Sequence, residues 1–238
     1  MEVFVIHAEK LKERGHHIDS MLRSIGMDYC FINEGKNEEL IQTYLNSWMK
    51  NGLENMCERT SSRVLCTLSH FLAYKRIIDD GIEGALILED DIVLHKGFLP
   101  QFEQSIKEYE KYYSTRKIII SYEDSTLQLI PRSQREKGKM LYLKKDCRLA
   151  GAYYINRNAC ISILEHLETQ HCDRAIDWYN AKLIKEGYIE CLWCHPALAT
   201  QGSFTGLFKS SMSKKKDHIE TVRWWLKKRY KQLLYWFR

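Results

Sequence analysis

The segment ALILEDDIVL, at residues 85–94, restricts the possible folds of this chain more than any other part of the sequence. Its four leading apolar residues predict a buried strand, and Glu89, Asp90 and Asp91 follow where that strand should end. Three adjacent acids repel one another and cannot be buried without a compensating cation. Ligands bind at the carboxyl ends of strands in open α/β sheets, and hard divalent ions prefer oxygen ligands. The segment therefore predicts an α/β fold with a metal and diphosphate site, with a solvated acidic turn as the alternative.

Apolar periodicity elsewhere predicts strands that alternate with helices. We expect strands at residues 3–6, 31–32, 117–120 and 151–155, and helices at residues 9–20, 40–49, 67–80, 98–113, 161–167 and 175–185. Residues 131–148 are polar and basic with little pattern, which predicts a mobile loop. The alternation favours a Rossmann-like α/β fold in which helices flank a mostly parallel sheet. The 238 residues contain no low-complexity linker and suffice for one such domain.

The positive charge of the chain is concentrated at its carboxyl end. Residues 209–238 contain ten Lys or Arg and two Asp or Glu, so they carry +8 while the whole chain carries +5 and residues 1–208 carry −3. We therefore expect one domain at residues 1–208 and a basic, aromatic tail at residues 209–238. An acidic body with a basic tail indicates an anionic partner for the tail. Nucleic acid is not the expected partner, because aromatic and basic residues mix only in the tail.

Residues 218–238 have the pattern of an amphipathic helix. The apolar side consists of Ile219, Val222, Trp225, Leu226, Tyr230, Leu233, Trp236 and Phe237. The opposite, basic side consists of Lys227, Lys228, Lys231 and Arg238, interrupted by Trp224 and Tyr235. We expect this helix to lie in the interface of an anionic membrane, with aromatic rings at the headgroups and cations on the lipid. The alternatives are packing on the body of the protein or a contact between two subunits.

The expected compartment follows from features that the sequence lacks. The start, MEVFVIHAEK, has no basic stretch before a long apolar run, and no run approaches the roughly 18 apolar residues of a membrane span. We therefore expect a cytoplasmic protein, peripheral on the inner face of the cytoplasmic membrane. Its eight cysteines would be free thiols in a reducing compartment. Cys191 and Cys194 form a CxxC motif without the second pair of a structural zinc site, so we interpret them as semi-buried thiols.

Six segments occur in the order and spacing of one enzyme family. They read VFVIHAEKLKER, CTLSHFLAYKRII, ALILEDDIVL, LAGAYYINRNAC, AIDWYN and PALATQGSFT. Up to about residue 205, the chain resembles the family 25 glycosyltransferases, of the lipooligosaccharide-biosynthesis galactosyltransferase type. The resemblance implies a GT-A type fold, a UDP-hexose donor (often UDP-galactose), an inverting reaction and an Mn²⁺ or Mg²⁺ cofactor. The sequence departs from the family pattern at His7, where Asn is usual, and at Leu65, where Gly is usual.

The acids of ALILEDDIVL match the acidic motif of that family. We expect Asp91 to ligate the metal ion directly, with Glu89 as a further ligand. Glu89 and Asp90 would contact the ribose, the donor sugar or a metal-bound water. Strand alternation would place Glu89 and Asp91 on one side and Asp90 on the other.

Further residues are expected at the donor and acceptor sites. Asp177 is the candidate base, because an inverting transfer needs a carboxylate that deprotonates the acceptor hydroxyl opposite the leaving group. Trp178 and Tyr179 beside it would stack on a sugar ring. The alternative for Asp177 is an acid that the helix dipole favours in the first turn of a helix.

Four residues are expected to contact the donor. The resemblance brings Ser69 and His70 near the diphosphate or the sugar hydroxyls, although His70 could equally be a satisfied histidine on a polar helix face. Gly151 would let the donor sugar approach the backbone, or would simply begin a strand. Gln201 would contact the metal or the diphosphate.

These expectations combine into an inverting, metal-dependent transfer of a hexose from a UDP-sugar to a glycolipid or oligosaccharide, such as lipopolysaccharide or lipooligosaccharide. The alternatives are glucosyl or N-acetylhexosaminyl transfer by the same fold, a metal-dependent phosphohydrolase, and an inactive membrane-tethered glycan-binding protein.

Overall fold

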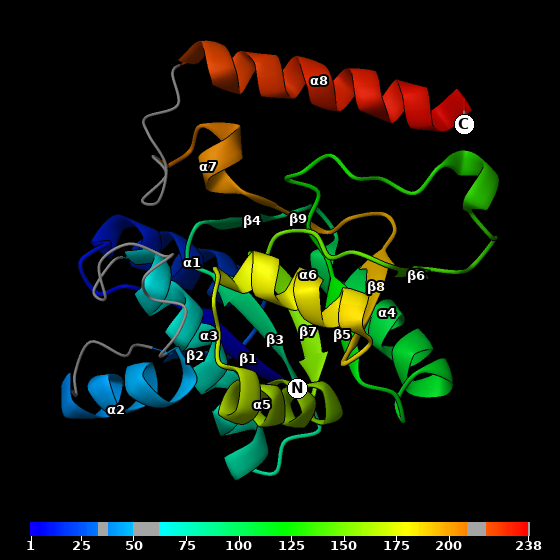
Figure 1. The fold of residues 1–238 in the computed structure, drawn as a ribbon. Coiled ribbons are helices and arrows are strands. Elements are labelled where there is room, and N and C mark those ends of the chain that lie inside the picture. The colour runs from blue at the N-terminus through cyan, green and yellow to red at the C-terminus, as the bar shows by residue number, and fades with distance from the viewer. Residues whose placement is uncertain (33–37, 50–61, 209–217, 238) are drawn as a thin grey trace.

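The computed structural model of the chain describes residues 1–32, 38–49, 62–208 and 218–237 (Figure 1). Its centre is a seven-stranded sheet with the order β2-β1-β3-β7-β5-β8-β6. The strands are β1 (Glu2–Ile6), β2 (Cys30–Ile32), β3 (Gly84–Glu89), β5 (Ile118–Ser121), β6 (Leu141–Lys144), β7 (Ala152–Asn156) and β8 (Glu190–Cys194). β1 is parallel to β2 and β3, and β5 is parallel to β8, whereas β7 and β6 run antiparallel to their neighbours. The expected mostly parallel sheet is therefore confirmed.

The apolar run of β3 is continuous because both faces of the sheet are covered. Ala85 and Ile87 enter one hydrophobic cluster, Leu86 and Leu88 enter the other, and all four side chains are fully buried. Their burial fixes the register of β3, which places the first charged residue, Glu89, at the carboxyl end of the strand.

Helices flank the sheet on both faces, as expected (Figure 1). One face is covered by α2 (Glu38–Trp48), α3 (Ser62–Asp79), α5 (Arg157–Gln170) and α6 (Ile176–Glu186). The other face is covered by α1 (Lys12–Ser24) and α4 (Phe98–Tyr112). Each of these helices overlaps one that was predicted from the sequence.

The prediction of a loop throughout residues 131–148 is wrong. The segment contains a 3₁₀ turn, η1 (Arg132–Gln134), and the edge strand β6, which pairs antiparallel with β8. Leu141 and Tyr142 are buried whereas Leu143 is 53% exposed. Because β6 is short and bonded on one side only, its apolar pattern covers too few residues to stand out in a basic segment.

A second, two-stranded sheet brings the late part of the chain to the acids. β4 (Ile92–Leu94) pairs antiparallel with β9 (Ala199–Gln201), which places Ile92 opposite Gln201. The short helix α7 (Gly202–Thr205) follows, and the Gly202 N–H donates to the carbonyl oxygen of Asp91 at 2.7 Å. A Cβ at position 202 would lie 2.7 Å from that oxygen, so this close approach requires glycine.

The C-terminal helix predicted from the sequence is present as α8 (His218–Phe237), which lies across one end of the molecule beside α7 and η1 (Figure 1). Its basic, aromatic side faces the body, because the Trp224 indole donates to the carbonyl oxygen of Ser125 at 3.0 Å and Lys228 is buried. The apolar side faces outward, with Leu226 67% and Phe237 79% exposed.

The expected division of the chain at residue 208 stays a prediction, because residues 209–217 lie outside the described part. Among the helices that are described, none combines the length and hydropathy needed to cross a membrane.

Candidate active site at the carboxyl end of the sheet

The acids collect where β3 and β5 end. Glu89 is the last residue of β3, and Asp90 and Asp91 form the turn into β4. A second pair, Glu123 and Asp124, follows β5 and is also buried. The strand alternation on which the expected sides of Glu89, Asp90 and Asp91 depended therefore stops at Glu89, and the three side chains have different surroundings.

Asp90 is paired with two basic side chains of the chain itself. Its Oδ2 lies 2.8 Å from Nδ1 of His7, and its Oδ1 accepts from Nη1 of Arg14 at 3.2 Å. His7 follows β1 and Arg14 lies on α1, so Asp90 fastens both elements to the turn. His7 is also a position at which the sequence departs from the pattern of the family that it resembles. The expected contact between Asp90 and the donor would have to replace these bonds, which favours a structural role.

Asp91 is buried and incompletely paired. Its Oδ2 lies 3.7 Å from Nη1 of Arg14, whereas its Oδ1 has no hydrogen-bond partner among the described residues. Burial raises the pKa of Asp91, and the Arg14 charge opposes this shift. A buried carboxylate oxygen without a partner suits a hard cation, which prefers oxygen ligands. Asp91 therefore fits the Mn²⁺ or Mg²⁺ ion that was expected.

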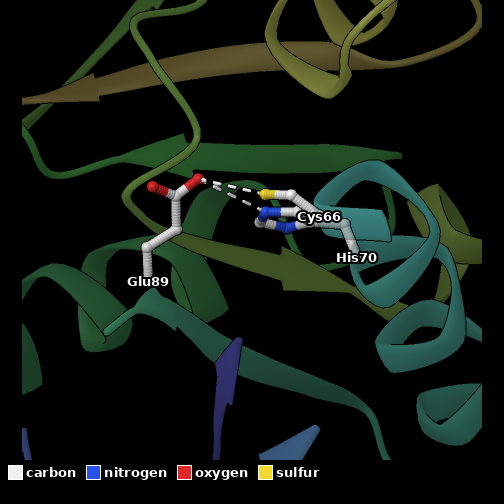
Figure 2. A group of neighbouring side chains, drawn as sticks. All are labelled: Cys66, His70 and Glu89. Carbon is white, nitrogen blue, oxygen red and sulfur yellow. Dashed lines mark hydrogen bonds and ion pairs between the residues drawn. The ribbon is translucent and has the colours of Figure 1, made fainter. Parts of the chain in front are cut away.

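Glu89 lies between two side chains of α3 and the side chain of Gln201. Figure 2 shows its Oε1 facing Cys66 and His70 of α3, at 3.8 Å from Sγ and 3.6 Å from Nε2. Its Oε2 accepts from Nε2 of Gln201 at 3.2 Å. Burial raises the pKa of Glu89 well above its usual value, and the charge of Asp91 adds to the shift. The structure thus brings together the predicted residues Glu89, His70 and Gln201.

Ser69 and His70 have different surroundings on α3. The Ser69 hydroxyl donates to the carbonyl oxygen of Leu65 at 2.9 Å, so it is satisfied within its own helix. His70 is fully buried, with Nδ1 2.7 Å from the Tyr153 hydroxyl and Nε2 without a hydrogen-bond partner. Burial lowers the pKa of His70 to about 4, and Asp177 opposes this. His70 is therefore a neutral imidazole with a nitrogen directed at Glu89.

Asp177 lies in the first turn of α6, as its alternative interpretation predicted. Its Oδ1 accepts the N–H of Ala150 at 2.6 Å. Burial raises the pKa of Asp177, and the Ala150 N–H and His70 oppose the shift. Of its neighbours, Trp178 is 70% exposed, whereas Tyr179 is fully buried and bonds His166 at 2.7 Å. The expectation that Tyr179 stacks on a sugar is therefore wrong, because its ring belongs to the core, while Trp178 keeps that possibility.

Gly151 connects the acids through its backbone. Its N–H donates to Glu123 at 2.8 Å, and its carbonyl oxygen accepts the N–H of Glu89 at 2.8 Å. A Cβ at residue 151 would lie 2.7 Å from Nε2 of Gln201. A side chain at residue 151 would therefore displace Gln201, and the expected approach of the donor sugar to Gly151 stays a prediction.

Glu123 was not predicted from the sequence. It is fully buried, and burial raises its pKa to about 8, while the hydrogen bonds from Ser125 and Gly151 oppose the shift. The Ser125 hydroxyl lies 2.6 Å from its Oε2. The sequence pattern could have identified it, because Glu123 and Asp124 come shortly after a predicted strand, as the acids after β3 do.

Asp124 joins the C-terminal helix to this end of the sheet. Its Oδ2 lies 2.8 Å from Nζ of Lys228, and its Oδ1 accepts from the Thr200 hydroxyl at 2.6 Å. Nε2 of His95 lies 2.8 Å from the same hydroxyl. The side chains of this ion pair are 11% and 6% exposed, so α8 is held by a nearly buried charge pair next to Glu123.

The chain is similar in sequence to known glycosyltransferases. Residues 1–179 match the model of the family described as Glycosyltransferase family 25 (LPS biosynthesis protein). Over 231 residues the chain is 22% identical to the lacto-N-neotetraose biosynthesis glycosyltransferase LgtE of Neisseria meningitidis serogroup B, which covers 94% of this chain and 82% of that protein. It is also 27% identical over 119 residues to procollagen galactosyltransferase 2 of Mus musculus, which covers 46% of this chain and 19% of the mouse protein. Among solved structures, galactosyltransferase LgtC in complex with donor and acceptor sugar analogs superposes with a TM-score of 0.45 at 10% identity, covering 94% of this chain and 83% of that one.

Proposed function

Because this chain belongs to glycosyltransferase family 25 and is therefore a glycosyltransferase of lipopolysaccharide or lipooligosaccharide synthesis, we propose that it transfers a hexose from a UDP-sugar to such a glycan. Galactose is the proposed hexose, since one relative is named a galactosyltransferase. The single observation that carries the donor site is the group of buried acids at the carboxyl end of β3, with one carboxylate oxygen of Asp91 unpartnered among the described residues.

The proposed ligands of a divalent ion are Asp91 and Glu89. Asp91 offers its Oδ1, which is unpartnered among the described residues, and Glu89 is the last residue of β3, with Oε2 of its carboxylate accepting from Gln201. When bound, Mn²⁺ or Mg²⁺ would neutralise the negative charge of the diphosphate. Arg14, which lies 3.7 Å from Asp91, adds a fixed positive charge at this point.

Asp177 is the proposed general base of an inverting reaction. The acceptor hydroxyl oxygen attacks the anomeric carbon, the bond from that carbon to the diphosphate breaks, and UDP leaves with the electron pair. Asp177 takes the hydroxyl proton through the carboxylate that Ala150 orients. The raised pKa makes it a stronger base than an ordinary carboxylate. Trp178 is exposed beside it and offers an aromatic face to the acceptor sugar.

We propose that α8 attaches the enzyme to an anionic membrane that carries the acceptor. Ile219, Leu226 and Leu233 of its outward side are 70%, 67% and 59% exposed. Arg223, Lys227 and Arg229 are also exposed on this helix and supply the charge complementarity. Since Lys228 holds α8 over the carboxyl end of β5, a membrane on its outer side would lie at the end of the molecule that contains the acids.

A test of this function uses the purified full chain with UDP-galactose, UDP-glucose and UDP-N-acetylhexosamines, with and without Mn²⁺. We expect a UDP-hexose to raise the melting temperature only when the metal is present, because a bound donor stabilises the fold by mass action. We also expect UDP release to require both the metal and a glycan acceptor. Donor cleavage that does not depend on an acceptor and yields no glycoside would instead indicate a phosphohydrolase.

A further inference from the structure

Cys66, His70 and Glu89 form a group of three metal-ligand types apart from the Asp90–Asp91 turn. Cys66 and His70 are four residues apart on α3 and therefore lie on one side of that helix. Glu89 projects towards them from the end of β3 (Figure 2). One ligand atom from each residue can be chosen so that all three lie within 4.8 Å of one another. In the described part of the chain, no other group of three or more His, Cys, Asp or Glu meets this criterion.

The distances suit a single ion held between the three side chains. A tetrahedral zinc ion lies about 2.0–2.3 Å from nitrogen, oxygen and sulfur ligands, which separates those ligands by about 3.3–3.8 Å. Oε1 of Glu89 lies 3.6 Å from Nε2 of His70 and 3.8 Å from Sγ of Cys66. An ion could therefore be accommodated with little movement of the side chains.

Hydrogen bonds to the other polar atoms of His70 and Glu89 orient their ligand atoms towards the site. Nδ1 of His70 is bonded to the Tyr153 hydroxyl at 2.7 Å, which leaves Nε2 directed at the site, fully buried and without a hydrogen-bond partner. Oε2 of Glu89 accepts from Gln201 at 3.2 Å, which leaves Oε1 directed at the same point. Outer hydrogen bonds of this kind orient metal ligands in proteins.

We propose that Cys66, His70 and Glu89 bind a zinc-class divalent ion, with the fourth position open to water or another small ligand. A thiolate and an imidazole select Zn²⁺ over the hard ions Mg²⁺ and Mn²⁺. On binding, the S–H bond of Cys66 breaks, its proton goes to solvent, and the metal–sulfur bond forms. Cys66 is only half-buried, which gives the ion a route of entry. Glu89 is thus shared with the proposed Mn²⁺ or Mg²⁺ site, but the zinc-class assignment requires neither sugar transfer nor Asp91.

Cobalt provides the test, because Co²⁺ accepts the same ligands and absorbs strongly in the near ultraviolet when it is bonded to a thiolate. The full chain, freed of metal and kept under a non-thiol reductant, is titrated with Co²⁺. We expect a sulfur-to-cobalt band that saturates at one equivalent and is bleached by Zn²⁺ but not by Mg²⁺. Cys66→Ser should abolish the band, and Glu89→Gln should weaken Co²⁺ binding by about tenfold or more.

Cys30→Ser is the matched control, since Cys30 is an exposed thiol on β2 and should leave the band unchanged. Zn²⁺ should raise the melting temperature of the wild type and of Cys30→Ser, but not of Cys66→Ser. The absence of a thiolate band in the wild type would overturn the proposal. A band that persists in Cys66→Ser would do so as well, because another cysteine would then be the ligand.

Discussion

Residues next to one another in the sequence have different chemical surroundings in this site. Asp90 is held by His7 and Arg14, whereas Asp91 keeps one oxygen buried and without a partner among the described residues. The difference arises because the turn presents Asp90 to β1 and α1, while the backbone of Asp91 is bonded to Gly202. The two acids should therefore respond differently to the loss of charge.

Asp91→Asn should abolish transfer and weaken metal-dependent UDP binding by about a hundredfold or more, because an amide is a poor substitute for an anionic metal ligand. Isothermal calorimetry with and without Mn²⁺ measures this loss. Asp90→Asn is the matched comparison and should mainly lower the melting temperature, because it removes the charge of the buried carboxylate that bonds Arg14 and His7. Asp91 is not the metal ligand if its variant binds UDP with an unchanged metal dependence.

Asp177→Asn should lower turnover by about a hundredfold or more, the lower end for loss of a general base. Donor binding and stability should change little, because the amide oxygen can still accept the N–H of Ala150. The base acts deprotonated and its pKa is raised, so wild-type turnover should fall with decreasing pH at a higher pH than an ordinary Asp would give.

Asp173→Asn is the control for that experiment, because Asp173 lies nearby and is paired with Arg174, which lowers its pKa. Its turnover and pH profile should match the wild type. Near-normal turnover of Asp177→Asn would exclude Asp177 as the base.

Glu123 should make the protein less stable as pH rises. Burial raises its folded-state pKa to about 8 from an ordinary 4.5, so the folded state binds a proton that the unfolded state releases between these values. The free energy of unfolding should therefore fall by up to about 1.4 kcal/mol per pH unit in that window from this group. Glu123→Gln should flatten this dependence, which denaturant unfolding measured between about pH 5 and about pH 8 would show. An unchanged slope would mean that the nearby acids account for it.

The sequence indicated Asp91, Glu89 and Asp177 as candidates because each matches a motif whose chemistry needs a carboxylate, and their roles stay predictions. It did not predict that Tyr179 is buried, since only the docking of α6 decides which side of the aromatic pair faces the core. Nor did it predict the contacts of His7 and Arg14 with Asp90. Those contacts join residues that are 83 and 76 positions apart, and they depend on how β1, α1 and the turn assemble.

At the scale of elements, the strongly periodic helices and the buried strands were predictable, whereas strands β6, β8 and β9 were not. β8 contains the CxxC cysteines, and both thiols are buried among apolar neighbours rather than held as a ligand pair. Their pKa is raised to about 12 by burial. Short strands near the edge of a sheet carry little pattern of their own, because their positions are fixed by pairing with distant segments.

The docking of α8 on the body should depend on the Lys228–Asp124 pair. Lys228→Met keeps the apolar stem but leaves Asp124 as a buried charge without its cation, which costs about 3–5 kcal/mol when a buried pair is broken. We expect the amides of residues 218–237 to exchange hydrogen faster by about a hundredfold or more, measured by mass spectrometry.

Lys227→Met is the matched control, because Lys227 is exposed on the same helix and surface changes rarely exceed about 0.5 kcal/mol. The combined change Asp124→Asn with Lys228→Met should recover part of the protection, since no charge is then left buried. Equal exchange in the Lys228 and Lys227 variants would show that the indole of Trp224 and other contacts hold the helix without the ion pair.

Considered as a whole, the molecule places its acids and its exposed helix at the same end. β3 and β5 end there, and Lys228 of α8 bonds to the acid that follows β5. The tail therefore packs on the body through its basic side and still exposes its apolar side, so packing on the body does not exclude membrane binding by the same helix. Deleting α8 would both remove the proposed membrane contact and expose Asp124, so substitutions on its outer side separate the two effects.

The variant Leu226→Gln with Leu233→Gln and Phe237→Gln should bind membranes poorly but keep its fold. These side chains are 67%, 59% and 79% exposed, so the change leaves the contacts of Trp224 and Lys228 intact. Each substitution removes about 1.5 kcal/mol or more of the free energy gained when the side chain inserts into the membrane. The three losses together predict a fall in vesicle binding of at least about a hundredfold. Co-sedimentation with vesicles of varied anionic lipid content measures the fall.

The control for this variant is Tyr112→Gln with Leu143→Gln and Tyr188→Gln, which changes side chains that are 60%, 53% and 40% exposed elsewhere on the body. It should sediment with vesicles like the wild type. Binding of the wild type should also weaken as salt rises, because the cations of α8 contribute roughly 1 kcal/mol each at an anionic surface and screening shortens their reach to about 8 Å at physiological ionic strength. If the outer-side variant sediments like its control but has a smaller oligomer mass, the apolar side of α8 joins two copies of the chain instead of contacting lipid.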